Sequence, residues 1–114
     1  MKIMNEKLLE KKLRDEVKKL GGLALKFGTT YHTGMPDRIV LMPGGQTRFV
    51  ELKSTGKKPT ALQVKSLELL NDLGFKAVVI DSQESLDNFL NNLIQSNHAA
   101  WHRNEQYNGS RNFE

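Results

Sequence analysis

Two short charged motifs on either side of a glycine turn are the part of this sequence best suited to chemistry. Asp37 follows Pro36, and Lys53 follows Glu51 at a spacing of two. Side chains alternate along a strand, so Glu51 and Lys53 share one face and the apolar residues around them share the other. A chain reversal at Gly44-Gly45 would bring Asp37 to within about one residue of that pair. Two carboxylates and a lysine on a sheet edge predict a site for a divalent metal ion and a phosphodiester.

The same residues allow a simpler interpretation and one test of register. Charged pairs are common on exposed edge strands, which accounts for Glu51 and Lys53 taken alone. Asp37 at the other end of the hairpin favours the site. A plain two-residue turn would place Asp37 opposite Leu52, on the wrong face. We therefore expect an odd-length loop, a β-bulge, or an Asp37 that precedes the regular pairing.

Two helices could bring further polar groups to this site. On a helix over about residues 5–20, Glu6 lies within the apolar stripe and Glu10 at its margin. A carboxylate on a buried face needs a partner, although acids near a helix start also interact with the helix dipole. Gln63 completes a capping box with Thr60. It could serve that cap alone, or also reach the site.

The formal net charge of +4 suits a polyanionic partner, and equally suits an ordinary basic surface. There is no cysteine, which excludes disulfides and thiolate metal sites, and the histidines do not form a convincing zinc set. Several basic side chains could follow a phosphate backbone. They are Lys26, Arg38, Arg48, Lys57 and Lys58.

The element order predicted from periodicity and turn signals is α-β-β-β-α-β-α. After the first helix come a strand over 23–27, a hairpin over 36–42 and 47–53, a helix over 60–73, and a strand over 76–80. A last helix is capped by Asp81-Ser82 and runs through Leu93. A hairpin followed by a helical crossover predicts an α/β fold, a mixed β-sheet of about four strands flanked by helices.

At 114 residues, 38% of them hydrophobic and 26% charged, the chain has the composition of one soluble domain. No apolar run approaches the roughly 20 residues of a membrane helix, and no secretory pattern is present, so we expect a cytoplasmic protein without a membrane partner. We expect a domain over 1–96 and a polar tail over 97–114. The tail holds Trp101, Tyr107 and Phe113, and is either disordered or an arm that packs on a second copy.

These motifs together resemble the virus-type replication-repair nuclease (VRR-NUC) family of the PD-(D/E)XK superfamily. The resemblance covers about residues 5–95. Matching stretches are Leu9-Glu10 through Leu20-Gly21-Gly22, Lys26-Phe27, Gly34-Met35-Pro36-Asp37-Arg38-Ile39-Val40, Pro43-Gly44-Gly45, Phe49-Val50-Glu51-Leu52-Lys53, Lys58-Pro59 with Gln63, and Leu73-Gly74-Phe75.

The resemblance implies a restriction-endonuclease-like core and a role for each matching residue. Asp37 and Glu51 would be metal ligands, helped by the backbone carbonyl of Leu52. Lys53 would be the motif lysine and Gln63 the glutamine beside it. The first-helix carboxylate would be Glu6 or Glu10, with a slight preference for Glu6.

The resemblance also implies Mg²⁺- or Mn²⁺-dependent cleavage of DNA. Small single-domain members look like phage proteins, which places this one in the host cytoplasm, and resemble Holliday-junction resolvases that act as dimers on branched DNA in repair. We therefore expect a structure-selective endonuclease and a homodimer. Apolar residues of the last helix could form its interface, although most could be core: Leu86, Phe89, Leu90, Leu93 and Ile94. The alternatives are a DNA-binding module that does not cut, or a nuclease of RNA-directed or restriction type.

Overall fold

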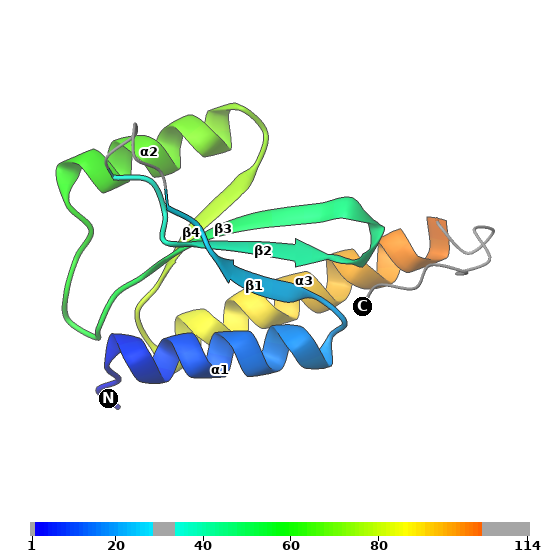
Figure 1. Cartoon of the computed structure of the whole chain (residues 1–114), viewed down its shortest axis with the longest axis horizontal. Helices are drawn as coiled ribbons and strands as arrows, with labels where there is room; N and C mark the ends of the chain where they lie inside the picture. Colours follow the sequence, from blue (N-terminus) through cyan, green and yellow to red (C-terminus); the bar gives the residue numbers. More distant parts are fainter. Residues whose placement is uncertain (1, 29–33, 104–114) are drawn as a thin grey trace.

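A four-stranded mixed sheet forms the centre of the computed structural model, which describes residues 2–28 and 34–103, the last seven by their backbone alone. The strands lie side by side in sequence order (Figure 1). The first two pairings are antiparallel, and the pairing of β3 with β4 is parallel. The strands are β1 (Leu23–Lys26), β2 (Arg38–Met42), β3 (Gln46–Leu52) and β4 (Lys76–Ile80).

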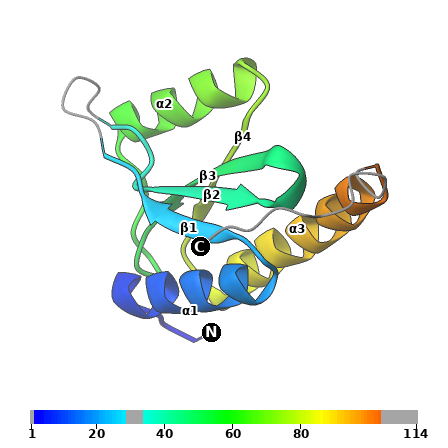
Figure 2. The ribbon, with the colours of Figure 1, turned by 45° about the vertical axis from the view of Figure 1, so that its right-hand side comes forward.

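Helices cover both faces of this sheet. α1 (Glu6–Lys19) and α3 (Gln83–Arg103) lie together on one face, and α2 (Ala61–Asp72), the crossover from β3 to β4, lies on the other (Figures 1 and 2). The element order and the mixed, helix-flanked sheet confirm the predicted fold class. Among the described residues, no helix has the length and apolar character needed to cross a bilayer.

Each face of the sheet has its own hydrophobic core. The larger core joins α1 and α3 to alternate residues of the strands, including Val50 and Leu52. The smaller core lies under α2 and is built on Phe49, Leu70 and Ala77. Because residues alternate along β3, Glu51 belongs to the α2 face, as Phe49 does.

The register of the β2–β3 hairpin confirms the prediction for Asp37. A three-residue 3-10 turn, η1 (Pro43–Gly45), joins the strands, and both of its glycines have positive φ. Pairing runs from Met42 opposite Gln46 to Arg38 opposite Val50. One further step places Asp37 opposite Glu51, on the same face. The loop is odd in length, and Asp37 precedes the paired residues.

Two expectations are corrected. The Glu51 strand is not a sheet edge: β3 lies between β2 and β4, and Glu51 is only 3% exposed. The last helix does not stop near residue 96, because α3 continues to Arg103. The tail from Asn97 therefore begins inside a helix, and residues 104–114 lie outside the described part, with Tyr107 and Phe113 among them.

The apolar residues proposed for a dimer interface on α3 are mostly core. Leu86, Phe89 and Leu93 are buried against the sheet, and only Ile94 is well exposed. Exposed leucines gather instead on α2, at Leu62, Leu69 and Leu73. Leu70 is the buried leucine of α2.

Candidate active site

The two predicted carboxylates come together at the carboxyl end of β3. Asp37 Oδ1 accepts a hydrogen bond of 3.2 Å from the backbone N–H of Leu52, next to Glu51. Glu51 Oε2 accepts one of 3.0 Å from Gln63 Nε2 and lies 3.5 Å from Lys53 Nζ. The four residues named by the sequence pattern as the centre of a site are therefore in one cluster.

Burial and neighbouring negative charge raise the pKa of both carboxyl groups. Burial, and secondly the charge of Asp37, raise the pKa of Glu51 to about 7, against the opposing effect of Lys53. Burial also raises the pKa of Asp37, although the Leu52 N–H and the charge of Arg38 oppose this. Two carboxyl groups that resist ionisation together would be stabilised as anions by an added cation.

The side chains present fit a divalent metal ion. Glu51 Oε1 is buried and has no hydrogen-bond partner among the described residues, which leaves a lone-pair site unused. The described residues hold no cluster of three or more His, Cys, Asp or Glu side chains arranged for a metal. Mg²⁺ is commonly bound by one or two carboxylates with water and substrate oxygens, so Asp37 and Glu51 suffice as the protein's acidic ligands.

Gln63 has both of the roles that its sequence left open. Its backbone N–H donates to Thr60 Oγ1 and its Oε1 accepts from the Thr60 N–H, which completes the capping box of α2. Its Nε2 remains free to donate to Glu51. The helix cap thus fixes the amide that holds one oxygen of Glu51.

The two first-helix glutamates have different surroundings. Glu6 is exposed at the start of α1, and its charge acts on both Asp37 and Glu51, raising the pKa of each. Glu10 forms an ion pair with Arg38, which is 5% exposed, and a looser one with Arg14. The charge of Glu6 therefore acts on the two site carboxylates, whereas Glu10 neutralises the buried Arg38.

Two residues that sequence reasoning missed hold α1 against the site. Ser54 Oγ accepts the backbone N–H of Glu6 at 3.0 Å. Thr55 Oγ1 accepts the N–H of Met4 at 3.0 Å and donates to the carbonyl of Asp81 at 2.7 Å. These contacts join the loop after Lys53 to the start of α1. No local pattern indicated them, because each partner lies far away in the sequence.

The side chains predicted to contact nucleic acid differ in their exposure to solvent. Lys26, Lys57 and Lys58 are exposed. Arg38, by contrast, is buried with its guanidinium paired to Glu10. Arg48 is likewise buried, at 7% exposure. The side chains of His32, His98 and His102 lie outside the described residues.

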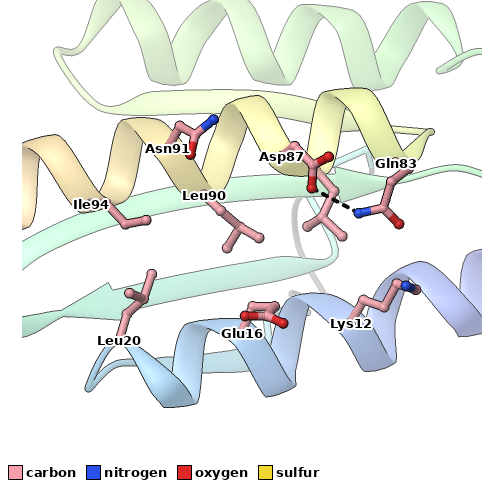
Figure 3. A pocket seen from close by; sticks show the side chains of 9 residues that line it. Lys12, Glu16, Leu20, Gln83, Asp87, Leu90, Asn91 and Ile94 are labelled. Carbon is pink, nitrogen blue, oxygen red and sulfur yellow. Dashed lines mark hydrogen bonds between the residues drawn. The ribbon is translucent and has the colours of Figure 1, made fainter.

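The groove between α1 and α3, about 420 Å³ in volume, is separate from this cluster (Figure 3). Its charged lining residues are Lys12, Glu16 and Asp87. None of the predicted site residues lines it. The predicted site residues therefore lie apart from this groove.

Comparisons with known proteins agree with the geometry. The chain is 43% identical over 84 residues to "Putative nuclease p44" of Acyrthosiphon pisum secondary endosymbiont phage 1, over 74% of this chain and 90% of that protein. A solved structure described as a VRR_NUC domain matches with a TM-score of 0.70 and 30% identity, over 79% of this chain and 94% of that one. A second, a VRR_NUC domain protein at 19% identity and a TM-score of 0.61, covers 87% of this chain and 92% of its own, and supports the fold alone.

A scan against models of protein families gives no match. The similarity to the phage protein and to the first solved structure nevertheless extends over most of each chain. The chain belongs to the VRR-NUC family of nucleases.

Proposed function

We propose that this protein is a divalent-metal-dependent endonuclease that hydrolyses phosphodiester bonds in DNA. The observation that carries the proposal is the pairing of Asp37 with Glu51, whose buried Oε1 has no partner among the described residues. A buried carboxylate oxygen without a donor is costly unless something absent from the protein itself occupies it. A hard cation is the occupant that suits this chemistry.

Each residue of the cluster has one task in this proposal. Asp37 and Glu51 hold Mg²⁺ or Mn²⁺, with the backbone carbonyl of Leu52 as a third oxygen. The bound ion supplies Lewis acidity toward the phosphoryl oxygen and lowers the pKa of a water molecule. Lys53 offsets negative charge as it develops on the phosphate, and its 3.5 Å separation from Glu51 keeps it within the site.

Gln63 and Glu6 complete the cluster. Gln63 orients the Glu51 carboxylate through the hydrogen bond to Oε2. Glu6 adds negative charge at the rim of the site, on the side where the start of α1 is held by Ser54. Glu10 has no catalytic task, because its carboxylate is engaged by Arg38.

The substrate is proposed to be branched DNA, cut by a homodimer. A four-way junction has two-fold symmetry, and one domain of this size has one cluster, so paired cuts need two copies in a fixed relation. The exposed leucines of α2 provide apolar surface for that contact. Lys57 and Lys58, in the loop between Lys53 and α2, provide positive charge for the DNA backbone.

The test is incubation with linear duplex, flap, single-stranded and four-way DNA, each with Mg²⁺, Mn²⁺ or EDTA. The proposal predicts metal-dependent cleavage, with four-way DNA cut fastest. Equal cleavage of all four substrates would remove the structure selectivity. Tight DNA binding without cleavage in any metal would favour the alternative of a binding module. Light scattering at micromolar concentration tests the dimer, and a monomer that cuts both strands symmetrically contradicts it.

A further inference from the structure

A second groove, about 530 Å³ in volume, follows the outer edge of β4. It is formed where β4 meets α3 and the end of α2. Its lining contains two cations, Arg48 and Lys76, and no acid; Asn71 and Val79 also line it. The lining of the α1–α3 groove has the opposite sign of net charge, since it has one lysine and two acids.

Arg48 is a buried cation without a counter-charge among the residues that the structure describes. Its guanidinium donates to the carbonyl of Thr47 and, at 2.9 Å, to Gln46 Oε1, but its Nε–H has no acceptor among the described residues. It makes no ion pair with any described residue, whereas the other buried arginine, Arg38, is paired with Glu10. A buried unpaired charge is costly, so the environment of Arg48 favours an anion from outside.

The guanidinium is also held in place before any ligand arrives. Gln46, which accepts from Arg48, donates from its Nε2 to the carbonyl of Ser96 on α3 at 2.8 Å. Arg48 is therefore fixed between β3 and α3. A fixed guanidinium loses little rotamer freedom when it binds an oxyanion, which strengthens recognition of phosphate.

The edge of β4 is arranged against pairing with another strand. Asn71 Nδ2 donates to the carbonyl of Ala77 at 3.0 Å, and Asn71 Oδ1 accepts the Ala77 N–H at 3.2 Å. The side chain thus occupies the outward backbone groups of Ala77, which an added strand would use. This disfavours a peptide strand, or a second copy joined edge to edge, as the occupant.

The groove lies one strand away from the carboxylate cluster. Val79, in its lining, pairs with Glu51 in the β3–β4 register, and Lys76 pairs with Arg48. Arg48 lies three residues before Glu51, about 10 Å along the strand, and because side chains alternate it faces α3 whereas Glu51 faces α2.

We propose that the β4-edge groove binds a phosphodiester group of the DNA substrate, other than the one that is cut, through Arg48 and Lys76. This inference rests on the proposed nuclease function, because it assigns the groove to the same substrate. The groove holds the flanking backbone while the Asp37–Glu51 cluster acts on the scissile phosphate.

The test compares Lys76→Gln and Arg48→Gln with Lys18→Gln, a matched exposed lysine in the last turn of α1, which does not line the groove. DNA binding is measured in EDTA over a range of salt concentrations. Loss of one phosphate contact should lower the slope of log K against log salt by about 1 and weaken binding about eightfold at about 0.1 M salt. Because Lys76 is exposed, Lys76→Gln carries the test if Arg48→Gln is unstable. In addition, the Arg48 Nε–H resonance should shift saturably as duplex DNA is added.

The proposal is overturned if Lys76→Gln binds DNA like Lys18→Gln, or if the groove variants change self-association and leave DNA binding unaltered. Cleavage by the wild-type protein with Mn²⁺ is measured in parallel. Wild-type cleavage with no effect of Lys76→Gln refutes the groove alone. A wild-type protein that neither binds nor cuts DNA refutes the proposed function.

Discussion

Replacing Glu10 tests whether the two glutamates of α1, Glu6 and Glu10, have different roles. Glu10→Gln keeps the shape of the side chain and removes its charge. The partner, Arg38, has a side chain only 6% exposed, whereas that of Glu10 is 30% exposed. The variant therefore leaves a nearly buried guanidinium without a counter-charge.

The expected loss of stability follows from those exposures. A hydrogen bond to a charged group contributes about 1.5–3 kcal/mol, and breaking a fully buried ion pair costs about 3–5 kcal/mol. Because Glu10 is partly solvated, we expect a loss of about 2 kcal/mol. For a domain of this size, this corresponds to a decrease in Tm of roughly 8 °C. The matched control is Glu16→Gln, whose ion pair with Lys19 is exposed and contributes no more than about 0.5 kcal/mol.

The assay combines urea or thermal unfolding with DNA cleavage below the Tm. Glu10→Gln should lose stability and retain most of its turnover while folded. Glu6→Gln should keep the wild-type Tm and lose cleavage, since its charge acts on the carboxylate cluster. The opposite result, a stable but inactive Glu10→Gln beside an active Glu6→Gln, would reverse the assignment.

Three further changes have defined outcomes. Because the pKa of Glu51 is raised from 4.5 to about 7, its carboxyl contributes stability that is complete below about pH 4.5 and is lost as the pH rises through about 7. Urea unfolding in EDTA should show a loss of about 3 kcal/mol over that range, most of it absent in Glu51→Gln; a flat profile for the wild type contradicts the burial argument. Lys53→Ala should lower kcat far more than DNA affinity, since its proposed role is in the transition state; equal losses in both would make it a binding residue. Gly34→Ala should destabilise by about 1–2 kcal/mol, measured by urea unfolding, because φ is +86° and the added Cβ would lie 2.8–3.0 Å from Leu62 atoms; unchanged stability would show that the loop adapts.

The hairpin and the helix cap could be predicted from sequence because their signals are local. Gly44-Gly45 marks the reversal, and the alternation of side chains then determines which residues share a face with Asp37. The capping box is written in four consecutive residues, Thr60 to Gln63. Both signals concern residues that are close in the chain or joined by one turn, so they were read correctly.

Contacts between distant elements gave no such signal. The Glu10–Arg38 ion pair joins α1 to β2. The side chain of Arg38, predicted to contact DNA, is buried in this pair. The bonds of Ser54 and Thr55 to the start of α1 depend on how two ends of the chain meet. Nothing local distinguishes a basic side chain that faces solvent from one that is buried and paired with an acid.

Hydrophobic periodicity misled where residues are helical without being buried. α3 continues past Ser96 although the apolar pattern ends there; Ala99 and Ala100 still favour a helix without needing a core. The leucines of α2 do not all lie on the face that packs against the sheet, and Leu62 and Leu69 remain exposed. A hydrophobic residue predicts burial only where a partner surface exists.

The most direct test of the central claim is cleavage of one end-labelled four-way DNA by the wild-type protein, Asp37→Asn and Glu51→Gln, with Mn²⁺ or EDTA. The fold of each variant is checked by circular dichroism. The account predicts Mn²⁺-dependent cleavage by the wild type and none by either folded variant, because each substitution removes a hard oxygen ligand. Near-normal cleavage by either variant, or wild-type cleavage that persists in EDTA, would contradict it.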